Sequence, residues 1–153
     1  MALEIERKFL LADDTWRAHG TRSERLRDGL VAADSGRKVR VRIYEKRSTL
    51  TVKSKEEAGT RAEFEYDIPR PDALELLEKH SSDIIVKTRH YVVFEGFTWE
   101  IDEYADQLAG IIIAEVELPA LDVPLPLPPW AGKEVTGLPE YKKINMLRRR
   151  PSE

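Results

Sequence analysis

Most of the chain alternates apolar and polar residues with a period of two, which is typical of β-strands that bury one face. Gly96 separates two such runs and predicts a hairpin that leads from residues 91–94 into residues 97–101. The run at 25–32 is the weakest of the set. In all, the pattern predicts eight strands, at residues 3–10, 25–32, 37–44, 49–55, 62–68, 84–94, 97–104 and 111–118.

Helical patterns are few and short. One helix is expected to start after Asp13 or Asp14 and to end at His19 before Gly20. A second is expected to open at residues 70–72, where Pro71 can occupy a first-turn position. A third would run from Pro139 or Glu140 to Arg149, and the five prolines within residues 119–129 predict an irregular segment.

This order of elements favours an α+β fold that is mainly antiparallel β. Long helices do not alternate with the strands, so a parallel sheet is not expected. Closure into a barrel removes the exposed edges of a sheet, which makes an eight-stranded closed β-barrel with a few short outer helices the natural architecture. With 153 residues, the chain is expected to form a single domain, 1–153.

Composition narrows the function classes. Charged residues make up 35% of the chain, yet the net charge is only −3, which argues against duplex DNA or an anionic membrane as partner. Cysteine is absent, which excludes disulfides, thiol catalysis and cysteine-based metal sites. The charged start lacks a signal-peptide core, and the apolar run at 108–114 is too short to span a bilayer, so a cytoplasmic location is expected.

Several common catalytic motifs are missing. The sequence has no Gly-rich dinucleotide loop, no P-loop and no nucleophile elbow after a strand. Its three histidines, His19, His80 and His90, lack the spacing of a zinc-binding helix. An enzyme built from this chain would therefore work with Asp, Glu, Lys and Arg.

The polar positions of the predicted strands carry charged residues in doublets of one sign. Acidic and basic doublets fall on different strands: the acids are Glu4, Glu6, Glu63, Glu65, Asp102, Glu115 and Glu117, and the bases are Lys8, Arg40, Arg42, Lys53, Lys55, Lys87 and Arg89. A solvated face of an antiparallel sheet also alternates, and periodicity alone does not say which face is inside. Like charges in a row repel, however, and a solvated face has no need to sort them by strand.

A cavity that binds a metal–polyphosphate would account for this sorting. Carboxylates are hard oxygen ligands suited to Mg²⁺ or Mn²⁺, and Arg and Lys match phosphate oxygens. An eight-stranded barrel is just wide enough to hold one elongated ligand.

The same segments resemble the CYTH superfamily, the triphosphate tunnel metalloenzymes, in its short bacterial form. The motifs that carry the resemblance follow the family order over nearly the whole chain: Glu4-Ile5-Glu6-Arg7-Lys8, Lys38-Val39-Arg40-Val41-Arg42, Thr51-Val52-Lys53-Ser54, Glu63-Phe64-Glu65-Tyr66, Val86-Lys87-Thr88-Arg89, Trp99-Glu100-Ile101-Asp102, Ala114-Glu115-Val116-Glu117-Leu118, and a closing segment with Trp130, residues 132–136, Tyr141 and Lys142. The second strand departs from the family's usual Gln-Gly-Tyr-Leu with Asp28-Gly29-Leu30-Val31. His90 and Lys143 also differ, and these differences bear on substrate choice.

The resemblance implies an eight-stranded tunnel with its charged face inward and metal-assisted hydrolysis of a linear triphosphate, most simply inorganic tripolyphosphate. The metal ligands that it implies are Glu4, Glu6, Glu115, Glu117 and Asp102. The implied phosphate ligands are Lys8, Arg40, Arg42, Lys53, Lys87 and Arg89. Glu63 and Glu65 are implied as supporting tunnel acids. Lys8 and Lys87 are the catalytic candidates, with Lys8 a proton acceptor if crowding by cations lowers its pKa. Lys55 is interpreted as a solvated charge.

Other functions stay open at this point. Thiamine triphosphate hydrolysis, nucleoside triphosphate hydrolysis and class IV-type adenylate cyclisation use the same three phosphates, and a polyphosphate-binding module would use the same cations. The expected partner is a small-molecule triphosphate, with no nucleic acid and no membrane, and exposed outer apolar faces suggest a homodimer. Trp16, Trp99, Trp130 and His90 are interpreted as packing residues, and Arg148, Arg149 and Arg150 as an exposed helix end.

Overall fold

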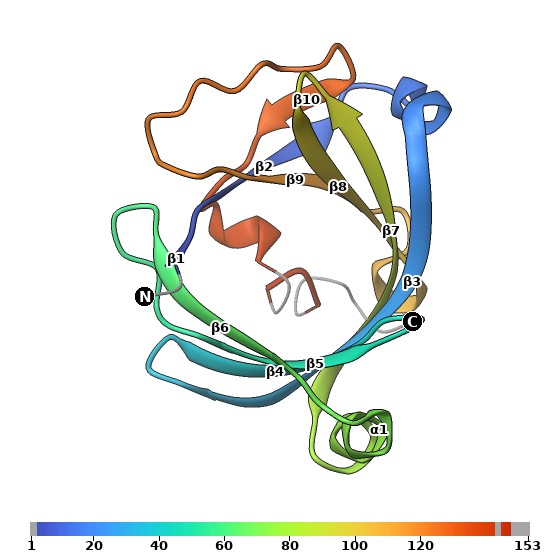
Figure 1. Cartoon of the computed structure of the whole chain (residues 1–153), viewed down its shortest axis with the longest axis vertical. Helices are drawn as coiled ribbons and strands as arrows, with labels where there is room; N and C mark the ends of the chain where they lie inside the picture. Colours follow the sequence, from blue (N-terminus) through green and yellow to red (C-terminus); the bar gives the residue numbers. More distant parts are fainter. Residues whose placement is uncertain (1–2, 143–144, 148–153) are drawn as a thin grey trace. The chain divides into compact units, whose positions relative to one another are not determined.

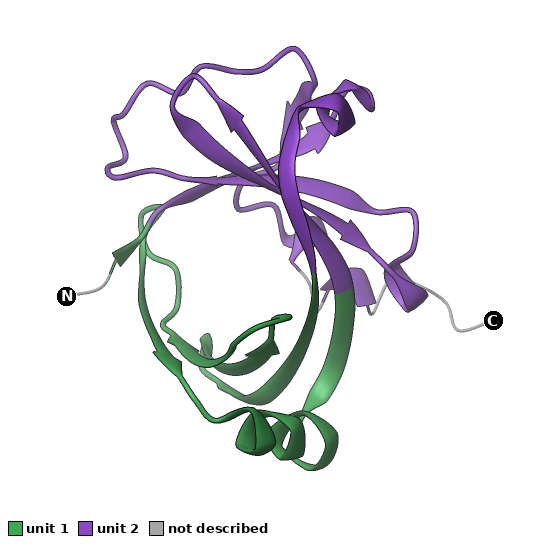
Figure 2. Cartoon of the chain, turned by 45° about the vertical axis from the view of Figure 1, so that its right-hand side comes forward, with its two compact units in different colours: residues 1–4, 25–86 green, residues 5–24, 87–153 purple. Residues whose placement is uncertain are grey.

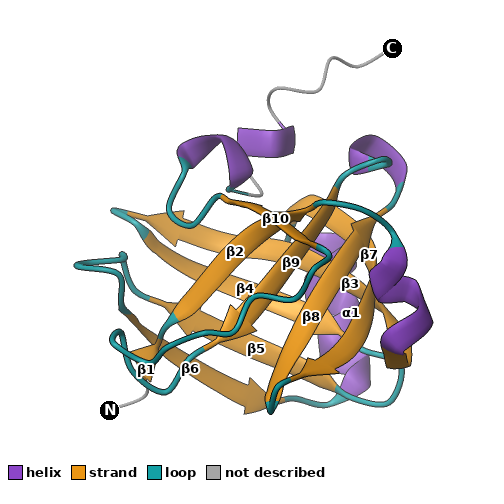
Figure 3. Cartoon of the chain, turned by 90° about the horizontal axis from the view of Figure 1, so that it is seen from above, coloured by secondary structure: helices purple, strands orange, loops and turns teal. Residues whose placement is uncertain are grey.

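The computed structural model describes residues 3–142 and 145–147, and strands dominate it (Figure 3). The strands, labelled in Figure 1, are β1 (Leu3–Glu4), β2 (Glu6–Leu11), β3 (Gly20–Asp34), β4 (Arg37–Ile43), β5 (Ser48–Lys53), β6 (Arg61–Asp67), β7 (Ser82–Phe94), β8 (Phe97–Tyr104), β9 (Ile112–Glu117) and β10 (Ala131–Glu134). The helical elements are α1 (Arg70–Lys79) and three 3₁₀ turns, η1 (Thr15–His19), η2 (Asp106–Leu108) and η3 (Pro139–Tyr141).

The strands pair antiparallel in the order β1-β6-β5-β4-β3-β7-β8-β9-β2-β10, which confirms the mainly antiparallel fold class. The first predicted strand is divided at Ile5: β1 pairs with β6, and β2 pairs with β9. The sequence did not predict β10, which pairs with β2. Among the described residues, β1 and β10 stand at the two ends of this order.

The chain divides into two compact units, residues 1–4 with 25–86 and residues 5–24 with 87–153 (Figure 2). Strands β3 and β7 each pass from one unit into the other. The single-domain organisation expected from chain length stays a prediction.

In the first unit, α1 covers the apolar face of the sheet. Ala73 and Leu77 of the helix pack with Val41 and Ile43 of β4, and all four are buried. Pro71 lies in the first turn of α1, where its missing N–H costs no hydrogen bond, and the predicted helix is confirmed. Because side chains alternate along β4, Arg40 and Arg42 lie on the opposite face of the sheet.

In the second unit, a tryptophan-rich core covers the apolar faces of β2, β8 and β9. Trp99 and Trp130 contact edge to face with their ring centroids 5.3 Å apart, and Phe9 packs against Trp99 at the same centroid distance. Leu125, from the irregular proline-rich segment, packs against this cluster. Trp16 is also buried in it, so the interpretation of the three tryptophans as packing residues is confirmed.

The remaining local predictions have mixed outcomes. The β7–β8 hairpin forms with Phe94 opposite Phe97, and its turn needs the positive φ angles of Glu95 (49°) and Gly96 (79°). The helix expected before Gly20 is the 3₁₀ turn η1. Gly20 follows it with φ of −67°, so it is not a left-handed cap.

The C-terminal helix is described only in part. Its expected range contains η3 and the helical residues 145–147, whereas residues 143–144 and 148–149 lie outside the described residues. The predictions for Lys143 and for the arginines at 148–150 also fall outside them. Among the described residues, no helix has the length and apolarity needed to cross a membrane.

Candidate functional site

Charged side chains on both units are withdrawn from solvent. Lys87 and Asp102 have no exposed side-chain surface, and the side chains of Arg42 and Asp28 are 5% and 4% exposed. On a solvated sheet face these groups would lie in water. The interpretation of the charged positions as a solvated face is therefore wrong for these four residues. Lys55, by contrast, is exposed, as expected from the sequence.

A buried cation–carboxylate cluster is formed by residues of β7 and β8. Asp102 is directly opposite Arg89 in the antiparallel register. Lys87 Nζ donates to Asp102 Oδ2 at 2.7 Å, while Arg89 donates through Nε to Oδ1 at 2.8 Å and through Nη2 to Oδ2 at 3.0 Å. Asp102 therefore binds two of the predicted phosphate ligands at once.

The opposite charges of this cluster shift the pKa values of Asp102 and Arg89. Burial raises the pKa of Asp102, but the charges of Lys87 and Arg89 outweigh it and lower that pKa to about 2. Burial lowers the pKa of Arg89, and the Asp102 carboxylate raises it well above its ordinary value. Arg89 Nη1 also donates to Glu100 Oε2 at 3.2 Å.

Apart from Asp102 on β8, the predicted metal ligands of the second unit lie on β2 and β9. Glu6 is directly opposite Glu117, and Lys8 is directly opposite Glu115, with Lys8 Nζ 3.7 Å from Glu115 Oε1. Opposed residues of an antiparallel pair have Cα atoms within about 5.5 Å, and like charges placed so are destabilising unless a cation neutralises them. The donor chemistry of Glu6, Glu115 and Glu117 thus fits a hard divalent cation. Within residues 3–142 and 145–147, however, no three acidic or histidine side chains are already grouped to bind one.

In the first unit, Glu4 lies in a small charged network with Lys53 and Glu63. Lys53 Nζ is 3.4 Å from Glu4 Oε2 and 3.0 Å from Glu63 Oε2. Burial raises the pKa of Glu4, but the hydrogen bond with Glu63 and the charges of Lys53 and Arg61 lower it to about 2. Burial and the hydrogen bond with Glu4 raise the pKa of Glu63.

Arg61 is a member of this network that the sequence reasoning missed. It is directly opposite Glu4 in the β1–β6 pair, and its Nε donates to Glu4 Oε1 at 2.8 Å. The sequence spacing could have indicated Arg61, because it precedes Glu63 by two residues and Glu65 by four and therefore lies on the same strand face as both.

The phosphate candidates of β4 have different neighbours. Arg42 is directly opposite Asp28 and donates to it through Nε at 2.6 Å and Nη2 at 2.8 Å. Arg40 is opposite Leu30 on β3 and Thr51 on β5. Asp28 is the second residue, after Arg61, that the sequence did not place in the site, although it stood out as a departure from the family's second strand.

The predicted tunnel acid Glu65 lies on β6 opposite Thr51, whose Oγ1 donates to Glu65 Oε2 at 3.4 Å. Of the five predicted metal ligands, Glu4 belongs to the first unit. Glu6, Asp102, Glu115 and Glu117 belong to the second.

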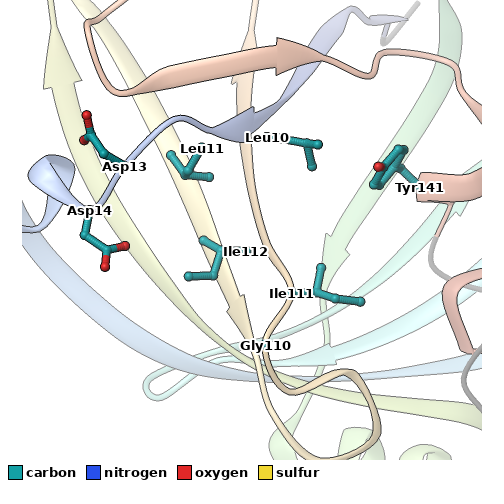
Figure 4. Close-up of a pocket in the computed structure, with 8 residues that line it drawn as sticks. All are labelled: Leu10, Leu11, Asp13, Asp14, Gly110, Ile111, Ile112 and Tyr141. Carbon is teal, nitrogen blue, oxygen red and sulfur yellow. The ribbon is translucent and has the colours of Figure 1, made fainter.

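An open, mainly apolar pocket also lies on the second unit (Figure 4). Its lining is Leu10, Leu11, Asp13, Asp14, Gly110, Ile111, Ile112 and Tyr141, which includes none of the predicted site residues. Apolar walls do not suit a polyphosphate, so this pocket is separate from the charged site.

Comparisons with known proteins agree with these features. The model of the CYTH domain matches residues 2–149. The chain is 38% identical over 149 residues to an inorganic triphosphatase of Acetivibrio thermocellus, an alignment that covers 97% of this chain and 95% of that protein. The chain belongs to the CYTH family.

Solved structures support the fold of this CYTH protein. A crystal structure of an inorganic triphosphatase matches with a TM-score of 0.68 and 28% identity over 97% of this chain and 100% of the other. A protein from Pyrococcus horikoshii OT3 matches with a TM-score of 0.63 and 19% identity, covering 78% of this chain and 80% of the other, and shows likeness of fold alone. CYTH triphosphatases generally depend on a divalent metal, which agrees with the carboxylates on β2 and β9.

Proposed function

We propose that this CYTH protein hydrolyses a linear triphosphate, inorganic tripolyphosphate in the first place, with Mg²⁺ or Mn²⁺. The observation that carries the proposal is the burial of oppositely charged side chains, Lys87 with Asp102 and Arg42 with Asp28. Glu6 and Glu117 face each other on neighbouring strands and add a carboxylate pair to this charged set. The name of the Acetivibrio thermocellus relative supports the same activity.

The proposed roles follow from side-chain chemistry. Glu6, Glu115 and Glu117 would hold the metal, with Glu4 as a further candidate, because carboxylate oxygens suit hard cations. When bound, the metal would offset phosphate charge and help to orient the attacking water. Arg40, Arg42, Lys53, Lys87 and Arg89 would bind phosphate oxygens and stabilise the charge that moves onto the leaving group.

Hydrolysis would proceed by attack of water on a terminal phosphorus atom. The bond between that phosphorus and its bridging oxygen breaks, so the products are orthophosphate and diphosphate, and the water proton passes to a nearby base. Lys8 is the candidate proton acceptor, and its Nζ lies 3.7 Å from Glu115 Oε1. The charged ammonium suits phosphate binding better than proton acceptance, so we assign Lys8 to the phosphates first.

Asp102 receives a modified role in this proposal. Both of its oxygens accept from Lys87 and Arg89, and metal coordination would compete with these contacts. We therefore propose that Asp102 holds the two cations in place for the phosphates.

A substrate and metal panel tests the function. Phosphate release is measured from tripolyphosphate, thiamine triphosphate, ATP and diphosphate, each with Mg²⁺, Mn²⁺ or chelator, and the products are identified. We expect metal-dependent release from tripolyphosphate that Glu115→Gln abolishes, whereas Glu78→Gln on the exposed face of α1 does not change it. Preferential turnover of thiamine triphosphate or ATP, or formation of a cyclic nucleotide, would select one of the other triphosphate chemistries. Tight binding without turnover, unaffected by chelator, would indicate a polyphosphate-binding module.

The expected partners and location stay predictions. These are a small-molecule triphosphate, no nucleic acid, no membrane, and a cytoplasmic site of action. The homodimer suggested by outer apolar faces has candidate contact residues in the first unit, where Leu3, Val52, Phe64 and Tyr66 are exposed. Sedimentation of the purified protein tests it.

A further inference from the structure

Asp28 and Arg42 form a buried ion pair on the charged face of the first unit. The two residues are directly opposite each other on the neighbouring strands β3 and β4. Arg42 donates from Nε to Oδ1 at 2.6 Å and from Nη2 to Oδ2 at 2.8 Å. The side chains of Arg42 and Asp28 are only 5% and 4% exposed, so solvent screens the electrostatic attraction between them much less than it would at the surface.

The pair fixes the orientation of the guanidinium. A guanidinium presents its five N–H donors in a rigid fork, and Asp28 occupies the edge formed by Nε and Nη2. Nη1 points to the other side, where it donates to the Tyr44 hydroxyl at 3.4 Å. Arg70 donates to the backbone oxygen of Tyr44 at 3.0 Å, which helps to fix that neighbour in turn.

The same arrangement recurs in the second unit. Arg89 donates to Asp102 through the same two nitrogens, at 2.8 Å and 3.0 Å, and Asp102 is again directly opposite in the register. Arg40, two residues before Arg42 on the same face, has Leu30 and Thr51 opposite it instead. In the strand register, a carboxylate therefore lies opposite Arg42, whereas the residues opposite Arg40 are neutral.

We propose that Asp28 is a positioning and specificity-determining residue for triphosphate binding through Arg42. It holds the guanidinium in one orientation and offsets part of its charge, so that the site binds a triphosphate while it still releases the diphosphate product. This inference rests on the proposed function. Arg42 would contact the phosphate, whereas Asp28 acts only through Arg42.

The test compares Asp28→Asn with the wild-type protein. Asn keeps an oxygen that can accept from Arg42 but removes the negative charge, so Arg42 should attract phosphate oxygens more strongly. We expect about a three- to tenfold lower KM for tripolyphosphate and a similar fall in the inhibition constant of diphosphate. A tenfold change corresponds to about 1.4 kcal/mol of binding free energy. Calorimetric binding of diphosphate gives the same comparison without turnover.

Two further variants separate this effect from simple stabilisation of the strands. Asp34→Asn is the matched control, since Asp34 pairs with Arg37 at 3.1 Å on the same two strands while both side chains are largely exposed. It should leave KM and diphosphate inhibition unchanged. In an Arg42→Lys background the effect of Asp28→Asn should shrink, because the fork that Asp28 orients is gone.

The contrary results are distinct. The inference is overturned if Asp28→Asn has a KM and a diphosphate affinity within about twofold of wild type. It is also overturned if Asp28→Asn changes these values as much in the Arg42→Lys background as in the wild type. Asp28→Gln repeats the charge removal with a longer amide, and unfolding of both neutral variants would assign the pair to stability alone and also overturn it. If the wild-type protein hydrolyses no tripolyphosphate, the proposed function fails, whereas normal wild-type turnover with unchanged variants refutes only the role of Asp28.

Discussion

Glu6 of β2 lies directly opposite Glu117 of β9 in the antiparallel register of the second unit. Two carboxylates in this relation repel each other, and a divalent cation between them would turn that repulsion into binding energy. The facing carboxylates therefore support the proposal that Glu6 and Glu117 are metal ligands.

Glu117→Gln tests this assignment. One oxygen ligand and one negative charge are lost, so the metal concentration for half-maximal tripolyphosphate hydrolysis should rise by about tenfold or more. A Mn²⁺ and Mg²⁺ titration of initial rates measures it. Glu78→Gln on α1 makes the same chemical change at an exposed position and should leave the titration unaltered. An unchanged metal dependence in Glu117→Gln would remove Glu117 from the metal site.

Lys53 should bind phosphate, and its near neighbour Lys55 should not. Lys53 is only 11% exposed and lies between Glu4 and Glu63, while Lys55 is exposed. Hydrogen bonds to charged groups contribute about 1.5–3 kcal/mol, so Lys53→Met should raise KM for tripolyphosphate by about ten- to a hundredfold. Lys55→Met, measured in the same steady-state assay, should stay near wild type. Equal KM values in the two variants would contradict the assignment of Lys53.

Asp102 links stability to pH. Its pKa falls from the ordinary 3.8 to about 2 on folding, because the charges of Lys87 and Arg89 outweigh burial. A lowered carboxyl pKa stabilises the fold above the unfolded value and loses that effect as pH falls through the folded value. We expect about 2 kcal/mol of the free energy of unfolding to disappear between pH 3.8 and about pH 2, as measured by urea denaturation.

The variant Asp102→Asn removes this contribution and leaves two buried cations without their carboxylate. Breaking a buried ion pair costs about 3–5 kcal/mol, so this variant should be strongly destabilised near neutral pH, and the difference from wild type should narrow toward pH 2. Asp122→Asn, in the exposed proline-rich segment, should be neutral. A pH-independent difference between Asp102→Asn and wild type would show that the carboxylate charge is not responsible.

Gly29 is required by close packing. A Cβ atom at this position would lie 2.7 Å from Ser81 Cβ and Oγ and 2.9 Å from Leu77 Cδ1. Gly29→Ala should lower the free energy of unfolding by about 1–3 kcal/mol, because the crowded side chains must shift. At Gly20 the nearest atoms are 3.9 Å and 4.0 Å away, so Gly20→Ala is the matched control and should be nearly neutral in thermal denaturation. Equal melting temperatures would show that Ser81 and Leu77 relax freely.

Much of the local structure could be predicted from the sequence. Alternation with a period of two located every predicted strand, and Pro71 and the leucines after it located α1. The charged doublets predicted which charged residues share a strand face, because strand geometry alone puts residues two apart on one face. β10 could not be predicted in this way, since its four residues carry no alternating pattern and it forms only by pairing with β2.

Which charges meet was decided only by the tertiary structure. The sequence by itself determined that Arg40, Arg42, Lys87 and Arg89 lie on polar strand faces, because side-chain direction along a strand follows from its backbone. It did not determine that Arg42 and Arg89 are each bound by an aspartate while Arg40 is opposite neutral residues. That difference depends on the register between strands that are distant in sequence, and register is fixed by packing of the apolar faces, where a shift of one residue would reverse every side chain.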